Sequence, residues 1–329
     1  MLYCVVNRQR VFSISPSPIP NRDIRAEAME TTTMVKKSHA IAVTAWIPLL
    51  VAPAIVVAVF PRELPKWAYM WTLAFTIYCG CKWLTWRTYK SERKSTTTVA
   101  RQFAYMLLWP GLDADAFLNQ TKVDDQPTRL ALLSAVIKTS VALACLIWVM
   151  PRTAELPVYL RGWFAAVCIV FVLHFGLFHL LSIAWRFKGV QARKLMNAPL
   201  LSTSLTEFWG KRWNVAFRDL THKFLFRPLL RKLGPNGALI IGFVMSGLIH
   251  DLVISVPAGG GYGQPTLYFM IQAIGVSIQK SEFASALKLD RGFRGWVVTT
   301  VFLLGPVVLL FHKPFMAEIM VPFTDLIGG

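Results

Sequence analysis

His250 lies in the middle of a nearly apolar stretch, and a histidine in such a place can act as a base. The flanking residues, 246–249 and 252–254, are apolar except for Ser246. Burial removes the water that stabilises an imidazolium ion, so the ring should be neutral. A neutral imidazole is a competent general base for an alcohol. A histidine that only hydrogen-bonds to a neighbouring helix would fit the same position, and the residues alone leave both interpretations open.

Asp251, His174 and His179 are further ionisable residues in apolar stretches, where the burial of charge is expensive. Asp251 points about 100° away from His250 around a helix, so we expect it to form an ion pair with a cation of another segment. His174 and His179 are five residues apart, a spacing that does not place them on one helical face. The five cysteines show no zinc-ligand spacing, and we predict no metal site.

The second candidate region is residues 204–214, which are rich in tryptophan and basic side chains. Ser204 and Glu207 have the spacing of a capping box, which predicts the start of a helix. Apolar residues then recur at steps of three and four, so we expect one amphipathic helix on the cytosolic face of the membrane. Its apolar stripe consists of Trp209, Trp213, Ala216, Leu220 and Phe224.

Asn214 lies between the apolar and the basic stripes of this predicted helix. Its carboxamide could hydrogen-bond a carbonyl group that arrives along the membrane surface, or it could simply face water. Lys211 and Arg212 could bind phosphate groups of a substrate or the headgroups of lipids. The spacing alone does not decide between these interpretations.

Membrane-spanning helices must position these residues. The chain of 329 residues is 55% hydrophobic and 16% charged, whereas a soluble domain is about 25% charged. The apolar excess must therefore face lipid, and we predict an all-α, polytopic helical bundle of about seven spans. A shorter apolar run, 103–112, should re-enter the membrane or lie at its surface. The predicted spans are 40–60, 67–86, 130–150, 162–185 and 237–256, with two shorter ones at 265–279 and 296–311.

The positive charges support this count. With seven spans and a cytosolic N-terminus, 28 of the 35 Lys and Arg lie in cytosolic loops, as the positive-inside rule requires. Lys82 and Lys138 should snorkel to the cytosolic surface from within their spans. Residues 1–38 are predicted to be a disordered, basic cytosolic tail, and 39–329 the membrane domain. Because the positive charge lies between apolar segments, it indicates membrane lipids and a phosphate-bearing substrate, and no nucleic acid.

Two motifs, FWGKRWN at 208–214 and SGLIHD at 246–251, resemble the wax synthase branch of the membrane-bound O-acyltransferases. LLWPGLDADAF at 107–117 and PAGGGYGQP at 257–265 support the resemblance, although the glycine run alone indicates only a tight turn. The resemblance implies that His250 is the catalytic histidine and that Asn214 positions the acyl thioester. We assign substrate binding to six further residues, Glu207, Trp209, Lys211, Arg212, Trp213 and Asp251. Many relatives carry His-Glu where this chain has His250-Asp251.

We therefore expect an enzyme that transfers an acyl group from acyl-CoA to the hydroxyl of a lipophilic alcohol, with acyl-CoA as co-substrate and no cofactor. The alternative is a proton- or ion-coupled transporter whose path would use the intramembrane histidines and Asp251. The membrane would be the endoplasmic reticulum in a eukaryote and the cytoplasmic membrane in a bacterium. The sequence leaves the alcohol, the acyl chain length and the oligomeric state open.

Overall fold

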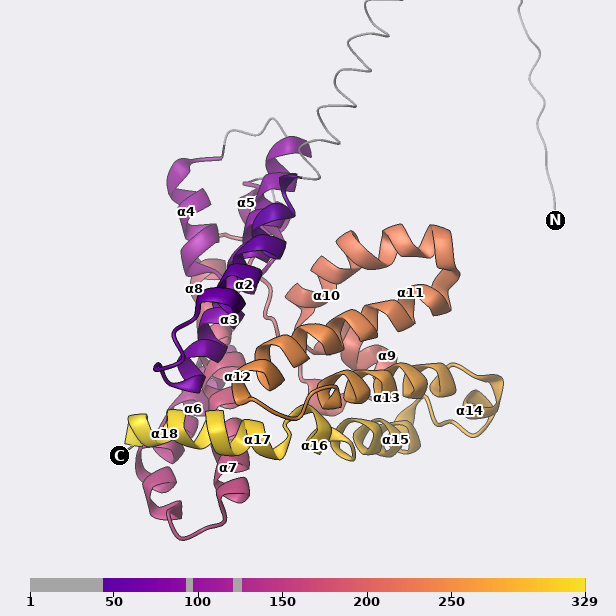
Figure 1. Cartoon of the computed structure of the whole chain (residues 1–329). Helices are drawn as coiled ribbons and strands as arrows, with labels where there is room; N and C mark the ends of the chain where they lie inside the picture. Colours follow the sequence, from indigo (N-terminus) through magenta and orange to yellow (C-terminus); the bar gives the residue numbers. More distant parts are fainter. Residues whose placement is uncertain (1–43, 93–96, 121–125, 329) are drawn as a thin grey trace, which may run out of the picture. The chain divides into compact units, whose positions relative to one another are not determined.

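The computed structural model describes residues 44–92, 97–120 and 126–328, and every regular element in these ranges is a helix. The predicted all-α fold class is therefore confirmed. The predicted tail, 1–38, lies outside the described residues. The helices of the first half are α2 (Ile47–Val59), α3 (Lys66–Glu92), α4 (Val99–Leu108), α5 (Ala114–Leu118), α6 (Arg129–Ala144), α7 (Val158–Val170) and α8 (Phe178–Phe187) (Figure 1).

The second half of the chain carries the two candidate motifs. Its helices are α9 (Leu205–Glu207), α10 (Val215–Thr221), α11 (Arg227–His250), α12 (Val256–Ala258), α13 (Gln264–Gln279), α14 (Glu282–Ala286), α15 (Gly292–Leu304), α16 (Val307–Leu310), α17 (Lys313–Phe315) and α18 (Val321–Gly328). Short π-helical turns join several helices, among them η3 (Phe171–Leu177), η5 (Phe208–Arg212), η6 (His222–Phe226), η7 (Asp251–Ser255) and η8 (Met316–Met320).

Four helical runs of the described chain are long and apolar enough to cross a membrane. They are Arg129–Thr153, Val158–Phe187, Val215–Ala258 and Gly292–Leu310, and Ile47–Val59 is a shorter apolar helix. The third run bends at Gly234, whose φ of 68° and ψ of 179° are not helical. A multi-pass helical membrane protein is thus confirmed, whereas the number of seven spans stays a prediction.

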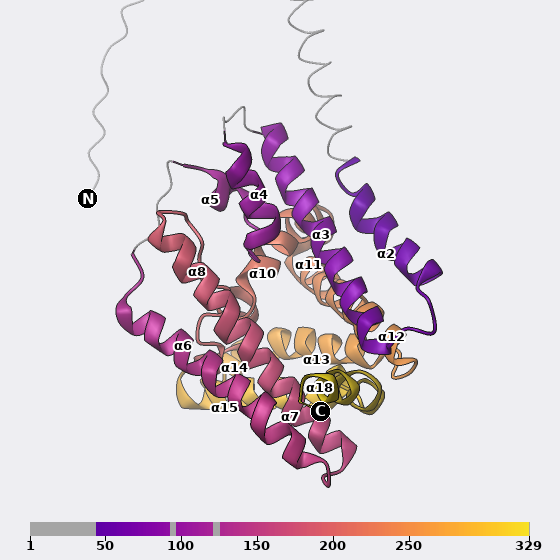
Figure 2. The same cartoon turned by 90° about the vertical axis from the view of Figure 1, so that its left-hand side faces the viewer.

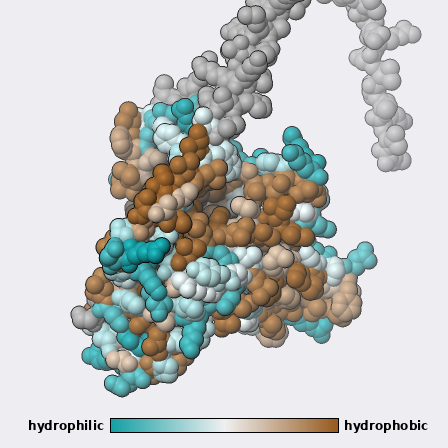
Figure 3. All heavy atoms as spheres, in the orientation of Figure 1, coloured by the Kyte–Doolittle hydropathy of each residue, from teal (hydrophilic) through white to brown (hydrophobic). Residues whose placement is uncertain are grey.

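Apolar side chains remain exposed on the outside of these helices. Leu50 on α2 is 65% exposed and Leu248 on α11 is 50% exposed. Figure 3 shows such side chains over α2 and over α11 on the face in view. Surfaces of this kind are costly in water and suit the hydrocarbon interior of a bilayer.

Helices that are neighbours in the sequence pair along their lengths. α2 packs along α3, and α6 packs along the continuous run of α7, η3 and α8 (Figure 2). α11 packs along α13, which returns antiparallel to it after the glycine-rich turn (Figure 1). An added Cβ on Gly247 of α11 would lie 2.6 Å from the Cα of Thr266, so this glycine permits the close approach of the two helices.

Loops that were predicted on the same side of the membrane contact one another. On the predicted outer side, Lys66 pairs with Glu318 at 2.9 Å and Arg161 with Asp325 at 2.6 Å. On the predicted cytosolic side, an added Cβ on Gly295 would lie only 2.3 Å from the carbonyl oxygen of Thr203, which precedes α9. These contacts agree with the alternation of loops that the charge distribution predicts.

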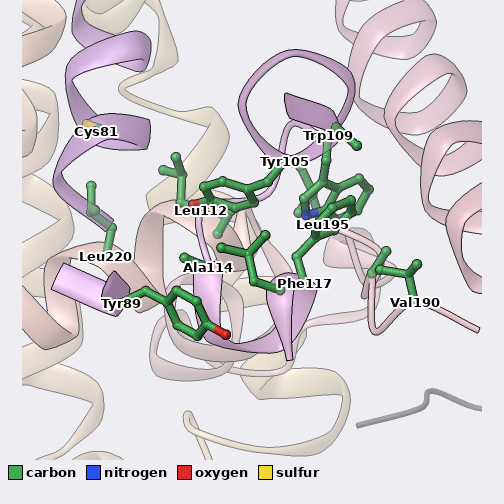
Figure 4. Packing of buried hydrophobic residues seen from close by; sticks show 14 residues of the cluster. Cys81, Tyr89, Tyr105, Trp109, Leu112, Ala114, Phe117, Val190, Leu195 and Leu220 are labelled. Carbon is green, nitrogen blue, oxygen red and sulfur yellow. The ribbon is translucent and has the colours of Figure 1, made fainter. Parts of the chain in front are cut away.

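The predicted re-entrant run exposes Phe103, Leu107 and Leu108 of α4 but buries the turn at its end. α4 ends at Leu108, and the turn that follows carries Trp109, which is 4% exposed. Figure 4 shows Trp109 beside Tyr105 and Phe117, in a buried cluster to which Leu220 of α10 also belongs. Irregular backbone at membrane depth is tolerated where protein surrounds it. The run 103–112 therefore does not continue into a span.

Lys82 does not snorkel, so the prediction for this residue is wrong. Its side chain is 1% exposed, and its ammonium group donates hydrogen bonds to the carbonyl oxygens of Tyr105 at 2.8 Å and Gly111 at 2.5 Å. The ammonium also lies 3.7 Å from the centre of the Tyr105 ring. The last turn of α4 and the turn after it supply carbonyl groups that have no helical partner, and these groups solvate the charge in place of water.

The glycine run between α12 and α13 forms the predicted tight turn. Gly259, Gly261 and Gly263 have φ angles of 72°, 76° and 79°, a region that favours glycine. A Cβ on Gly261 would lie 2.5 Å from ring atoms of His312, which is 1% exposed. The turn therefore needs glycine at this position both for its backbone conformation and for the close packing of the histidine ring.

We predict that Gly261→Ala destabilises the protein more than Gly263→Ala does. Both changes place a side chain in the left-handed region, which costs about 1–2 kcal/mol. Only the first also collides with His312, because no described heavy atom lies within 4 Å of a Cβ on Gly263. The measurement is the thermal unfolding midpoint of the detergent-solubilised protein. Equal midpoints for the two variants would contradict this account of the turn.

Candidate functional site

His250 is the last residue of α11, and its Nδ1 lies 2.7 Å from the carbonyl oxygen of Ser246. A carbonyl oxygen can only accept a hydrogen bond, so Nδ1 of the neutral ring carries the proton. The other ring nitrogen, Nε2, is then left with its lone pair. One turn of helix thereby holds the imidazole in the tautomer that a general base requires. Neither the bond nor the tautomer was predicted, although the four-residue spacing was visible in the sequence.

The imidazole packs on an aromatic ring of α13, which in turn contacts rings of α11 and η5. Its centroid is 4.6 Å from that of Phe269. Phe269 is 3% exposed and also contacts Trp209 and Phe243, at centroid distances of 5.6 and 6.4 Å. These rings exclude water from one side of the imidazole, as the sequence-based prediction of a neutral base requires.

Gly242, Ser246 and His250 form a row along α11, at steps of four residues. The Ser246 hydroxyl donates to the Gly242 carbonyl at 3.0 Å. No heavy atom of the described chain lies within 4 Å of a Cβ built on Gly242. At 100° per residue the row is turned away from the exposed face of the helix, which carries Ile240, Met245 and Leu248. There is thus open space on the interior side of α11, about 12 Å from His250 along the helix axis.

Asp251 points away from this row and caps α13. Its carboxylate accepts hydrogen bonds from the amide groups of Gly263 and Thr266, at 2.7 and 3.1 Å. It also accepts from the hydroxyls of Thr266 and of Ser255, the latter at 2.9 Å. The expected ion pair is therefore wrong, because the first amides of a helix lack partners within the helix and attract a carboxylate. Ser255 in turn lies 3.1 Å from Nε2 of His312.

The second motif begins with the predicted helix start. The Ser204 hydroxyl accepts from the amide of Glu207 at 3.1 Å, and the Glu207 carboxylate accepts from the amide of Thr203 at 2.8 Å. The side chain of Gln279, 4% exposed, accepts a further hydrogen bond from the amide of Leu205 at 2.7 Å. The motif is thus anchored at the C-terminal end of α13.

The predicted single amphipathic helix is wrong, since it breaks at Asn214. This residue has φ 39° and ψ 61°, in the left-handed region. The extended segment before α9 satisfies the backbone at the break, because Leu195 accepts from the amide of Val215 at 3.0 Å and Asn197 donates to the carbonyl of Arg212 at 2.7 Å. Contacts with a distant segment, which periodicity does not reveal, therefore override the local pattern.

The break divides the apolar stripe among three regions. Trp209 contacts Phe243 and Phe269, beside His250. Trp213 stacks on the ring of His174 at 6.2 Å, on the α7–α8 run. The rest of the stripe turns toward the cluster of Figure 4: Ala216, Leu220 and Phe224.

Asn214 also serves as the N-cap of α10. Its side-chain oxygen accepts from the amide of Phe217 at 3.3 Å. The Nδ2 group of the same carboxamide is a hydrogen-bond donor that capping does not use. The structure thus gives Asn214 a local role as a helix cap. Its role toward the thioester stays a prediction, and a substitution must separate the two.

Arg212 and Glu207 bind each other. The Arg212 guanidinium contacts one Glu207 oxygen through Nε at 2.8 Å and Nη2 at 2.7 Å. Its Nη1 donates to the carbonyls of Asn197 and Ala198 at 3.2 Å. Burial raises the pKa of Glu207, but the Thr203 amide and Arg212 outweigh it and hold this pKa below its usual range. Lys211, in contrast, is exposed.

Further positive charge lies near the ion pair of Arg212 and Glu207. Burial lowers the pKa of Lys194, and three nearby cations lower it further: Arg186, Lys138 and Arg212. Such repulsion favours an anionic ligand. Sequence reasoning singled out Arg212 and missed the other members of this group, because the segments that carry them are far apart in the chain.

Residues 192–272, which contain both motifs, match the sequence model of the membrane bound O-acyl transferase family. Over 95 residues the chain is 32% identical to acyl-CoA–sterol O-acyltransferase 1 of Arabidopsis thaliana, covering 27% of this chain and 28% of that protein. Over 72 residues it is 33% identical to long-chain-alcohol O-fatty-acyltransferase of Simmondsia chinensis, covering 20% of each. The matches thus span less than a third of these relatives. Within that span the resemblance to the wax synthase-like branch is confirmed.

We predict that Glu207→Gln lowers the thermal unfolding midpoint at pH 7 by about 2–4 °C, the shift expected for a loss of about 1 kcal/mol. The folded-state pKa of Glu207 is depressed, so its ionised form stabilises the fold above the ordinary Glu pKa of about 4.3, and this contribution is lost as the pH falls through the lower folded-state pKa. The difference from the unsubstituted protein should therefore vanish in acid. Glu282→Gln, at an exposed position, is the matched control. A difference in unfolding midpoint that persists in acid would contradict a stabilising ion pair between Glu207 and Arg212.

Proposed function

We propose that this chain, whose residues 192–272 carry the sequence of the membrane-bound O-acyltransferase family, transfers an acyl group from acyl-CoA to the hydroxyl of a lipophilic alcohol within the membrane. The observation that carries the proposal is the fixed tautomer of His250, which leaves Nε2 able to accept a proton. The names of the two relatives specify sterol and long-chain alcohol acceptors. A hydroxyl on a lipophilic body is the chemistry common to both.

In the proposed reaction His250 Nε2 removes the hydroxyl proton as the alcohol oxygen attacks the thioester carbonyl carbon. The new C–O bond forms while the carbonyl electrons move to oxygen. Collapse of this intermediate breaks the C–S bond, and the imidazolium returns the proton to the departing CoA sulfur. The Ser246 carbonyl, which accepts from Nδ1, stabilises the imidazolium while it exists.

The substrates would reach His250 by different routes. The open space beside Gly242 gives room on the interior side of α11 for the acyl thioester. Burial of the acyl chain would contribute about 0.8 kcal/mol per methylene. Lys211 and the cations around Lys194 suit the phosphate groups of CoA at the predicted cytosolic end. The alcohol would enter from the bilayer. Asn214 would orient the thioester through Nδ2.

A transporter has less support from the structure. Asp251 would be needed as a carrier of protons or ions, but three hydrogen bonds commit its carboxylate to the N-terminus of α13 and a fourth comes from Ser255. His174 stacks on Trp213.

Purified protein with labelled acyl-CoA and a panel of alcohols separates the two functions: ester formation supports the enzyme, and uptake into liposomes without ester supports transport.

We predict that His250→Gln lowers ester formation by at least about 10²-fold, the usual effect of losing a general base. Glutamine can still donate a hydrogen bond to the Ser246 carbonyl, so the local helix should survive, but it has no imidazole nitrogen to accept the proton. The rate is measured by release of CoA thiol. Unchanged elution and thermal unfolding of the variant would show that it is folded. Full activity would end the assignment of His250 as the base.

We predict that Asn214→Asp lowers kcat by about 10²-fold, because it removes the Nδ2 donor to the thioester. Aspartate keeps the capping oxygen and tolerates the left-handed conformation, so the start of α10 should remain intact. Asn214→Ala is the comparison, since it removes both the cap and the donor and should also lower the unfolding midpoint. A normal rate in the folded Asp variant would remove Asn214 from the mechanism.

A further inference from the structure

The indole nitrogen of Trp209 is buried and donates to no acceptor among the described residues. Buried Trp N–H groups usually have a partner, and one without a partner needs an explanation. Trp209 lies on the π-helical turn η5, within the FWGKRWN motif at 208–214. π-Helical turns occur frequently at functional sites.

Trp209 and the candidate base share one packing partner. Both rings contact Phe269, at centroid distances of 5.6 Å for the indole and 4.6 Å for the imidazole. The two rings are therefore no further apart than the sum of these distances. In the proposed reaction, an alcohol at His250 attacks the thioester carbonyl. That carbonyl would then lie close to the indole of Trp209.

The surroundings of Trp209 combine a fixed ring with open space. The ring packs edge-on against Phe208 at 4.9 Å and against Phe243 at 5.9 Å, which restricts its rotation. No described heavy atom lies within 4 Å of a Cβ on Gly210, the next residue, or on Gly242 of α11. A donor held in place beside such space can bind a substrate atom without reorganising.

We propose that the Nε1–H group of Trp209 donates a hydrogen bond to the thioester carbonyl oxygen and stabilises the negative charge that this oxygen acquires when the alcohol attacks. The inference rests on the proposed acyltransferase function and adds a second donor to Asn214. The indole loses no proton in the reaction: the alcohol proton passes to His250 and then to the CoA sulfur, and the charge on the oxygen returns to the carbonyl bond when the C–S bond breaks.

The test is Trp209→Phe, which keeps an aromatic ring against Phe269 and removes the donor. It should lower kcat by about 10²-fold, the effect of losing one oxyanion donor, and change KM for acyl-CoA little. The matched control is Trp71→Phe. The Nε1 atom of Trp71 is also buried without a described acceptor. Its ring packs on Phe75 of its own helix, α3, and on Phe323 of α18. This control should keep both kinetic constants.

A normal kcat in Trp209→Phe, or a raised KM with normal kcat, would overturn the donor role and leave Trp209 as a packing residue. If the Phe variant fails to fold, replacement of Trp209 by benzothienylalanine puts sulfur in place of N–H within the same ring shape, and the same fall in kcat is expected. If the unsubstituted protein forms no ester, the proposed function fails and this inference with it. A normal Trp209→Phe together with an inactive His250→Gln would overturn this inference alone.

Discussion

The hydrogen bond between His250 Nδ1 and the Ser246 carbonyl is the interaction on which the site depends. Within a membrane an imidazole stays neutral, and its single proton must be assigned to one nitrogen before the other can act as a base. Here the helix itself makes the assignment, through a carbonyl one turn earlier. No second polar side chain has to be buried for this purpose. α11 ends at this residue and continues as the π-helical turn η7.

Helix α13 connects the parts of the site. Asp251 caps its N-terminus, Phe269 in its middle packs on His250 and Trp209, and Gln279 at its C-terminus binds the amide of Leu205. The adjacent residues 250 and 251 thus have different roles. His250 lies on the side of α11 that carries Gly242, and Asp251 fixes α13, against which both motifs pack. A displacement of α13 would move the base and the tryptophan motif together.

The sequence predicts the apolar helices, the glycine turn and the helix start at Ser204, because each follows from local composition or spacing. The left-handed break at Asn214 was not predictable in this way, since the segment at 195–197 supplies the hydrogen bonds that stabilise it. Asp251 and Lys82 were misjudged for the same reason. The backbone groups among their partners become available only when the turn after α12 and the end of α4 fold back onto them.

The nature of the group behind the histidine also bears on the acyl donor. In hydrolases with a Ser-His-Asp triad a carboxylate stabilises the imidazolium, whereas a carbonyl, which carries no net charge, stabilises it less. An imidazole with this weaker stabilisation takes up a proton less readily, so it activates the alcohol less than a triad histidine would. A thiol has a pKa of about 8.5, so a CoA thiolate departs more readily than an alkoxide or an amine. Under the proposed function, a weaker base of this kind therefore requires a reactive acyl donor, and a thioester meets this requirement better than an oxygen ester or an amide.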